Sequence, residues 1–302
     1  MYFVEDSFYS KAKSLRAHFD KCFSNPKRLT AERFIWDYWN LPGQYTFLRT
    51  PAEDFFPKIL FGDFKKELIS WGKRNLGCFE ITPPWLSCYV EGNEQRLHAD
   101  MPHGPWAYVF SLSPQDIKFS GGQTLILKPG ILKFWNTLNR SNLFKGFEEQ
   151  QIFDEIVPRS NRLVVFDPRI PHGVRRVAGV QNVCEGRLVI HGWFTNPRPY
   201  VEGDLRVSDI QSTVSKLAQY VFECHKNEIN GCDGILTFKV FVEPSGKVKK
   251  VLLLISTLQS GDQTDKIKKE LTKTVSSFFR SIRFSKKSKS SSIVIPLVFE
   301  AD

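Results

Sequence analysis

The chain has 302 residues, of which 41% are hydrophobic and 25% charged, so it can form one large or two ordinary globular domains with a substantial core. No apolar run approaches the roughly 20 residues of a membrane span, and the N-terminus lacks the basic flank and apolar stretch of a secretory signal. The net charge of +10 is compatible with an acidic partner or nucleic acid, but solubility is the preferred interpretation. The C-terminal lysines are not interleaved with aromatic residues, so nucleic acid is not the expected partner.

Six scattered cysteines contain no CxxC pair, which indicates reduced thiols and a cytoplasmic location. In chain order, apolar residues at helical spacing predict a helix over residues 5–24 and a second one over about 51–74.

Between residues 77 and 193 the pattern changes to short β-rich runs separated by Gly, Pro and Asn, which is typical of a sandwich or barrel. The expected strands are 85–90, 107–113, 123–128, 131–135, 162–166, 173–177 and 187–194.

The last third of the chain predicts a separate small α+β domain. Residues 195–206 contain several turn formers and are expected to be a linker, which divides the chain into domains 1–206 and 207–302. A helix is expected first, followed by two strands joined by Pro-Ser-Gly, a second helix, a basic loop and a closing strand. The two helices are expected over 207–228 and 262–282, and the strands over 234–244, 247–257 and 292–300. The basic loop covers 285–292.

The candidate metal site combines RLHAD (96–100) with RIPHGV (169–174). On an extended segment, His98 and Asp100 point to the same face because side chains alternate. His172 can reach them if the intervening strands close into a small barrel. Two imidazoles and one carboxylate form a facial triad with open coordination positions, which suits iron(II).

The spacing alone is weak evidence, because His18 and Asp20 match it as well. That pair falls on a predicted helix, where positions i and i+2 diverge by about 200° at ~3.6 residues per turn. We therefore expect no metal there. His103, in a loop rich in Pro and Gly, is expected to be a loop residue or a substrate contact.

The motifs around the triad, in order along residues 77–195, resemble the prolyl-hydroxylase branch of the 2-oxoglutarate/iron(II) dioxygenases. They are CYVEGNEQRLHAD, AYVFSLS followed by GGQTLIL, NRLVVFDPRIPHGVRRV and GRLVIHGWF. The chain departs from the family pattern at Gln123, where Glu is usual, and at Ser111, where the family has Tyr. The resemblance implies a double-stranded β-helix, or jelly roll, so the fold is expected to be mainly β with flanking helices and a small C-terminal ββαβ domain.

The resemblance also implies how 2-oxoglutarate binds. Arg187 is the counterpart of the arginine that holds its distal carboxylate, and a guanidinium fork suits that task. Arg187 shares a strand face with His191 and Trp193, so His191 is expected beside the co-substrate and Trp193 in the substrate pocket. Tyr89 is expected to donate a hydrogen bond to the co-substrate. For His191 and Trp193, a place in the core remains the alternative.

Arg175 and Arg176 are rival arginines, but both lie too close to His172 to match the family spacing.

The implied activity is hydroxylation of a C–H bond with iron(II), 2-oxoglutarate and O2. Ascorbate is an optional further cofactor. A prolyl residue in a protein or peptide is the first expected substrate, and a free amino acid or small metabolite is the rival. Loops 91–106 and 136–160 are expected to decide between them. A cupin-like metal protein and a non-catalytic β-barrel interaction module are the other hypotheses.

Residues 231–302 resemble the C-terminal domain of TonB-like energy transducers. The resemblance implies a unit that docks a protein or dimerises, and a packing appendage is the alternative.

Overall fold

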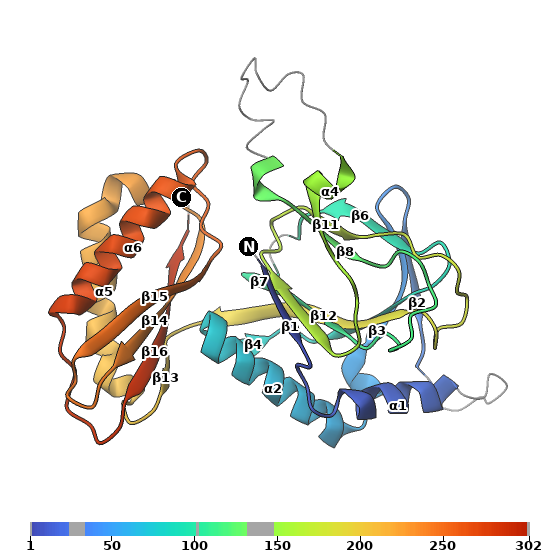
Figure 1. Ribbon diagram of the computed structural model, residues 1–302, viewed down its shortest axis with the longest axis horizontal. Coiled ribbons are helices and arrows are strands. Elements are labelled where there is room, and N and C mark those ends of the chain that lie inside the picture. The colour runs from blue at the N-terminus through green and yellow to red at the C-terminus, as the bar shows by residue number, and fades with distance from the viewer. Residues whose placement is uncertain (1, 24–33, 101–102, 132–147, 301–302) are drawn as a thin grey trace, which may run out of the picture. The chain divides into compact units, whose positions relative to one another are not determined.

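The computed structural model describes residues 2–23, 34–100, 103–131 and 148–300. They form two compact units (Figure 1). Residues 2–67 and 81–194 make up the first, here called the barrel unit, and residues 68–80 and 195–300 make up the second, the C-terminal unit. None of the described helices has the length and apolar character that crossing a membrane requires. All six cysteines are free thiols.

The barrel unit is built on one curled, antiparallel sheet of 12 strands. The order along the sheet is β1-β10-β7-β12-β5-β3-β6-β11-β8-β9, with β2 paired to β3 and β4 to β12. The mainly β fold with flanking helices is the predicted jelly roll. The strands are β1 (Tyr2–Asp6), β2 (Asp37–Leu41), β3 (Tyr45–Pro51), β4 (Cys78–Ile81), β5 (Trp85–Tyr89), β6 (Glu94–His98), β7 (Trp106–Ser111), β8 (Thr124–Leu127), β9 (Phe153–Ile156), β10 (Arg162–Phe166), β11 (His172–Val174) and β12 (Arg187–Pro197).

The first predicted helix starts later than expected. Residues Tyr2–Asp6 form β1, which pairs with β10, and helix α1 covers only Ala12–Phe23. Ser7, with a φ of 58°, separates the strand from the helix because such a backbone cannot continue either element. The pairing of β1 depends on a strand about 160 residues away, so no local pattern reveals it.

The second predicted helix is also shorter at its start. It is helix α2 (Lys58–Leu76), which begins directly after Pro57 and is preceded by a short 3-10 turn, η1 (Ala52–Asp54). Sequence analysis predicts no strands over 37–51, where the hairpin of β2 and β3 forms.

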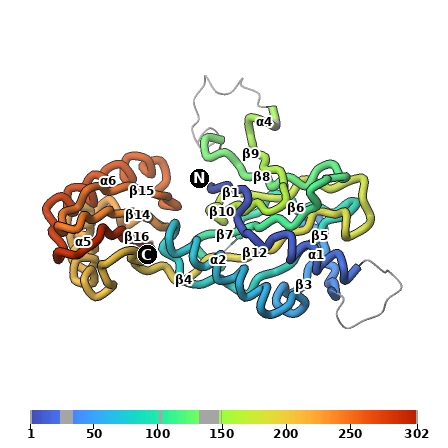
Figure 2. The backbone as a smooth tube through the Cα atoms, turned by 60° about the horizontal axis from the view of Figure 1, so that its bottom comes forward, coloured from blue at the N-terminus to red at the C-terminus, as the bar shows by residue number. Residues whose placement is uncertain are grey.

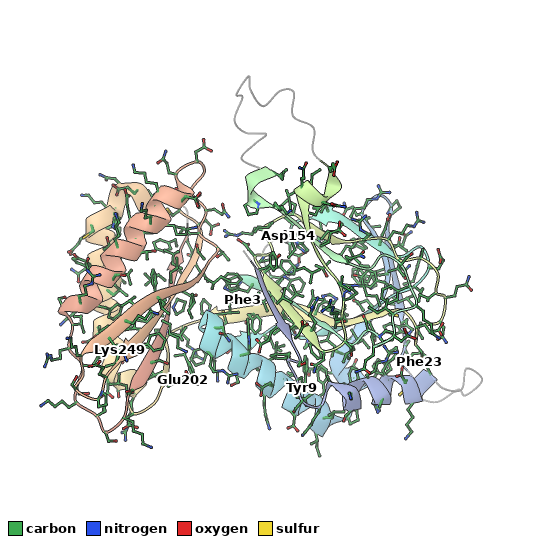
Figure 3. All side chains as sticks on the ribbon, viewed as in Figure 1. Phe3, Tyr9, Phe23, Asp154, Glu202 and Lys249 are labelled. Carbon is green, nitrogen blue, oxygen red and sulfur yellow. The ribbon has the colours of Figure 1, made fainter. Side chains whose placement is uncertain are left out.

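Helix α1 and the start of α2 lie next to the barrel strands (Figure 2), and aromatic side chains, among them Tyr9 (Figure 3), pack this layer. Tyr9 donates its hydroxyl proton to the Leu60 carbonyl at 3.2 Å and lies edge-on to Phe64, at 5.5 Å between ring centroids. Phe64 in turn contacts Phe110 of β7 at 4.8 Å. Burial of such large rings is the main stabilising term for this layer.

Two further predictions for the barrel unit change. The expected strand over 131–135 is wrong at Ile131, which lies in a helical turn, and residues 132–135 are outside the described part of the chain. Of the expected loop over 136–160, the described part contains helix α4 (Glu149–Ile152) and β9.

The C-terminal unit has a four-stranded sheet in the order β13-β16-β14-β15. Helices α5 and α6 supply the apolar residues that pack on it, and α6 buries Ile267, Leu271, Val275 and Phe279. The ββαβ order is as predicted. The elements are β13 (Tyr200–Glu202), α5 (Val207–Ile229), β14 (Gly234–Val242), β15 (Val248–Ser256), α6 (Thr264–Ser281) and β16 (Ser291–Phe299).

The expected linker over 195–206 is not an unstructured connection. β12 continues to Pro197, and β13 pairs with β16. Residues that favour turns do lie between these strands. The pairing of Tyr200 with Val294 joins positions far apart in the sequence, so the local sequence pattern does not predict it. The domain division at 206/207 stays a prediction.

Candidate active site

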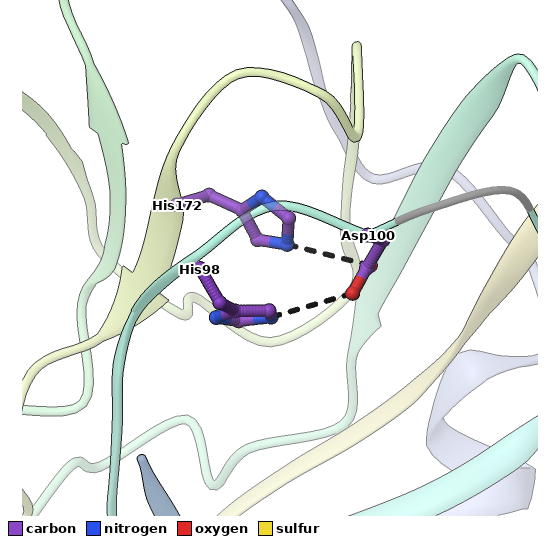
Figure 4. Close-up of side chains that lie close together, drawn as sticks. All are labelled: His98, Asp100 and His172. Atoms are coloured by element: carbon purple, nitrogen blue, oxygen red, sulfur yellow. Dashed lines mark ion pairs between the residues drawn. The ribbon is translucent and has the colours of Figure 1, made fainter. Parts of the chain in front are cut away.

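The three candidate metal ligands converge in the barrel unit (Figure 4). Asp100 Oδ1 lies 3.4 Å from His98 Nε2, and Asp100 Oδ2 lies 3.5 Å from His172 Nε2. The two imidazole centroids are 4.4 Å apart. Within the described part of the chain, this is the one group of His, Cys, Asp or Glu residues close enough to hold a metal.

Strand pairing creates this cluster. β11 lies between β6 and β8, and its pairing with β6 places the Cα of His172 opposite that of His98. A Cβ on Gly173 would come within 2.5 Å of the Gln95 carbonyl oxygen, so glycine permits the close approach of β11 to β6. Asp100, two residues past His98, is held by a hydrogen bond from its N–H to the Pro168 carbonyl at 2.9 Å.

The hydrogen bonds of the imidazoles leave the right nitrogens for a metal. His98 Nδ1 lies 2.8 Å from the Arg96 carbonyl oxygen, and His172 Nδ1 lies 2.9 Å from that of Ile170. A proton on each Nδ1 satisfies these carbonyls, so each Nε2, which faces Asp100, is the nitrogen available to a metal. This arrangement is usual for histidines that bind metals through Nε2.

The electrostatics of the cluster favour the ionised form of Asp100. Burial raises the pKa of Asp100, but hydrogen bonds and charge from His172 and His98 outweigh it and hold that pKa well below its usual range. Burial lowers the pKa of His98, and Asp100 together with the Arg96 carbonyl raises it by more. The site therefore presents an ionised carboxylate beside two imidazoles, a donor set that fits iron(II).

A cavity of about 270 Å³ connects this cluster to the predicted co-substrate residues. All seven predicted site residues line it: His98, Asp100, His172, Arg187, Tyr89, His191 and Trp193.

Arg187 is the most unusual residue in this cavity. Its side chain is fully buried, and its Nη2 donates a hydrogen bond to Thr124 Oγ1 at 3.1 Å. Its Nε and Nη1 are buried without a partner, and its guanidinium lies 4.7 Å from the Tyr89 ring centroid. Burial lowers the pKa of Arg187, although the guanidinium stays charged. A buried cation with unused N–H groups is suited to bind an anion.

Two residues of this pocket were not assigned from sequence. Thr124 is the hydrogen-bond partner of Arg187, and it lies within the GGQTLIL stretch that carries the family resemblance. Gln95 links the other groups, since its Oε1 accepts from the Tyr89 hydroxyl at 3.3 Å and its Nε2 lies 3.1 Å from His98 Nε2. Strict alternation would put Gln95, three residues before His98, on the opposite face of β6. An irregularity in the pairing of β6 with β11, where two residues along β11 match three along β6, brings Gln95 to the side of His98, so the local pattern did not predict it.

His191 lies on the same strand face as Arg187, as predicted. Its Nε2 is 2.8 Å from Ser87 Oγ. Burial, together with the positive charges of Arg49 and Arg187, lowers the pKa of His191 to about 3, so this imidazole is neutral.

Trp193 lies against His103, with 4.4 Å between ring centroids, and its Nε1 is buried without a partner. His103 also lines the cavity, as a substrate contact would, but it is not part of the metal cluster.

The residues that the sequence analysis rejected as metal or co-substrate ligands have other partners. His18 Nε2 lies 2.8 Å from the Phe55 carbonyl oxygen, and Asp20 pairs with Arg16 at 2.8 Å. Arg175 forms an ion pair with Glu155 at 2.8 Å.

One of the comparisons with known proteins, the family model, covers this site. The family model of the 2OG-Fe(II) oxygenase superfamily matches residues 84–195, which carry the whole triad and Arg187. A search of curated proteins finds no match.

Among solved structures, the chain is similar to a prolyl-4-hydroxylase of Pseudomonas putida at 17% identity and a TM-score of 0.43, covering 65% of this chain and 92% of that one. It is also similar to a Trichoplax adhaerens prolyl hydroxylase, solved with a peptide of hypoxia inducible factor, at 16% identity and a TM-score of 0.43, covering 64% and 83%. HygX of Streptomyces hygroscopicus, solved with nickel and 2-oxoglutarate, gives 14% identity and a TM-score of 0.40, covering 63% and 81%.

Residues 84–195 thus form a 2-oxoglutarate/iron(II) oxygenase domain. The predictions of an oxidoreductase of this class, with iron(II) and 2-oxoglutarate, are confirmed.

Proposed function

We propose that His98, Asp100 and His172 hold one iron(II) ion and that Arg187 binds the C5 carboxylate of 2-oxoglutarate. The carrying observation is the fully buried guanidinium of Arg187, whose Nε and Nη1 have no partner although it lines the same cavity as the triad. An anion at this point would offset the cost of burying an unpaired charge. Tyr89, Thr124 and His191 orient the co-substrate beside it.

The reaction that fits is hydroxylation of an unactivated C–H bond. One oxygen atom of O2 enters the substrate and the other enters succinate, while C1 of 2-oxoglutarate leaves as CO2. Iron(II) with 2-oxoglutarate supplies this oxidising chemistry when bound. The chain's own residues bind and orient: the Nδ1 hydrogen bonds fix both imidazoles, and the aromatic rings that line the cavity keep bulk water out.

A prolyl ring is the first substrate candidate, because the residue pattern resembles the prolyl-hydroxylase branch. A free amino acid or small metabolite is the second. One observation favours a small acid among these candidates. A second arginine, Arg49, lines the cavity and has no ion pair among the described residues.

Succinate formation from 2-oxoglutarate tests the proposal. We expect a slow iron(II)-dependent formation of succinate without substrate, and 2-oxoglutarate binding measured anaerobically in the presence of iron(II). Both should disappear in Asp100→Ala. Absence of 2-oxoglutarate binding to the iron-loaded protein would contradict the proposal. Mass spectrometry for a gain of one oxygen in peptide and metabolite pools then identifies the substrate class.

For the C-terminal unit we propose a docking or dimerisation role, as its resemblance to the TonB-like C-terminal domain implies. Its support is an open sheet with β13 and β15 at the two edges, which can accept another strand. The molar mass in solution, measured by light scattering on the full chain, tests the dimer. The cytoplasmic location and the use of ascorbate stay predictions.

A further inference from the structure

A second arginine, Arg49 on β3, faces the same cavity as the triad and Arg187. Its guanidinium carbon lies 3.3 Å from the centroid of the Trp39 ring and 3.8 Å from that of the Trp85 ring. The cation is therefore held between two indole rings, a favourable position for the planar guanidinium.

Strand register explains this arrangement. β3 pairs with β2 on one side and with β5 on the other. Asp37 and Ser87 are opposite Arg49, while Trp39 is opposite Phe47 and Trp85 is opposite Pro51. Each indole thus lies two residues along β3 from Arg49, on the same sheet face and in opposite directions. The strands thus present one indole from each side, and the guanidinium is fixed before any ligand binds.

Arg49 has no polar partner among the residues that the structure describes. Its Nε is buried without a hydrogen bond, and Asp37, opposite it in register, forms no ion pair with it. Burial lowers the pKa of Arg49, and the nearby Tyr45, Asp37 and Tyr89 only partly offset this. Of the other groups close by, Ser87 and His191 are bonded to each other and neutral.

The geometry restricts what can satisfy this cation. Indole rings cover both faces of the guanidinium, so a partner must approach in its plane, along the edge that carries the N–H groups. A carboxylate, which is flat and has two acceptor oxygens, matches that edge. A neutral amide offers only one acceptor and no charge.

We propose that Arg49 binds a carboxylate of the substrate, so that the enzyme hydroxylates a free amino acid or another small carboxylic acid. This rests on the proposed function, in which Arg187 already takes the C5 carboxylate of 2-oxoglutarate and the metal takes the other end. A prolyl residue inside a polypeptide has no such carboxylate, whereas free proline has both the ring and the acid. The cavity of about 270 Å³ is just below the range of roughly 300–1,000 Å³ for small-molecule sites, which suits a small substrate.

The test compares acids with their amides. The iron-loaded full-length protein is incubated with 2-oxoglutarate and a panel of free amino acids and short aliphatic acids, or with the primary amides of the same compounds. Gain of one oxygen is read by mass spectrometry, and succinate is measured in parallel. We expect hydroxylation of one or more free acids, with kcat/KM at least about 10-fold above that of the matching amide.

The variant Arg49→Gln should raise the KM for the acid by about 10- to 100-fold and reduce the preference for acid over amide to about twofold or less. Arg49→Lys keeps the charge without the planar fork, so it should retain part of the preference. The matched control is Arg159→Gln, which removes an exposed arginine outside the cavity and should keep the wild-type preference. If Arg49 only stacks on the two indoles, Arg49→Gln changes the melting temperature but not the acid-over-amide preference.

Three results separate failure of this inference from failure of the proposed function. Equal hydroxylation of acids and amides, or of prolyl peptides blocked at both ends, overturns the inference alone. Succinate formation without hydroxylation of any acid in the panel does the same. Loss of 2-oxoglutarate binding in Arg49→Gln but not in Arg187→Met would show that the co-substrate uses Arg49, which overturns both.

Discussion

The barrel unit and the C-terminal unit treat buried polar groups differently. Among the described residues, every buried side-chain nitrogen or oxygen without a hydrogen-bond partner belongs to the barrel unit. In the C-terminal unit the buried hydroxyls are all satisfied: Thr237 donates to the Leu76 carbonyl at 3.1 Å, and Thr257 and Ser291 accept backbone N–H bonds at 2.9 and 3.0 Å.

This difference separates a ligand-binding region from one that is only packed. A buried polar group without a hydrogen-bond partner costs about 1–3 kcal/mol of folding free energy, so folded proteins contain few such groups. Four of the residues that carry such groups line the cavity: Arg49, Tyr108, Arg187 and Trp193. Their concentration there is explained if ligands supply the missing partners.

The largest expected effect is the loss of the metal. His172→Ala removes one of three candidate ligands, so iron affinity should fall by more than the roughly 10- to 100-fold typical of outer-shell partners. Succinate formation should fall to background. Iron content after desalting, measured by atomic absorption, checks the first point. The matched control is His18→Gln, which alters the other HxD pair and should keep both iron and activity.

The next largest effect is expected for Arg187→Met, which tests whether the buried guanidinium binds an anionic ligand. We expect the Kd of 2-oxoglutarate to rise by about 100-fold, because a bidentate charged contact is lost. Without ligand, the variant should unfold at the same or a higher temperature, since an unpaired buried charge is replaced by an apolar chain of similar size. Calorimetry gives both values. A destabilised apoprotein would mean that Arg187 supports the fold itself.

The sequence identifies some of these groups and not others, for physical reasons. His98, Asp100 and Arg187 could be placed because strand alternation and an ordered family pattern both act over short distances. Arg49 could not, because the hairpin of β2 and β3 was not predicted and its two indoles meet only through pairing with β2 and β5. The strand β1 was missed for the same reason. Long-range pairing, rather than local propensity, determines these features.

A smaller effect is expected from Thr124→Val, which removes the hydroxyl that accepts a hydrogen bond from Arg187 Nη2. The side-chain volume is kept, but the guanidinium then has one more unmet N–H group. The Kd of 2-oxoglutarate should rise by about fivefold, equivalent to roughly 1 kcal/mol. An unchanged Kd, measured by anaerobic titration of the iron-loaded protein, would show that Thr124 does not position the arginine for its ligand.

The smallest effect concerns Thr237→Val, the counterpart of that substitution in the C-terminal unit. Thr237 is as buried as Thr124, and its Oγ1 donates to the Leu76 carbonyl at 3.1 Å. Loss of this bond should lower the free energy of unfolding by about 1 kcal/mol, because the carbonyl is left unmet. The Kd of 2-oxoglutarate should stay at the wild-type value. Since the two substitutions are chemically the same, a change in stability alone at 237 and in ligand affinity at 124 would demonstrate the different use of buried polar groups. A loss of affinity in Thr237→Val would instead show that the two units are coupled.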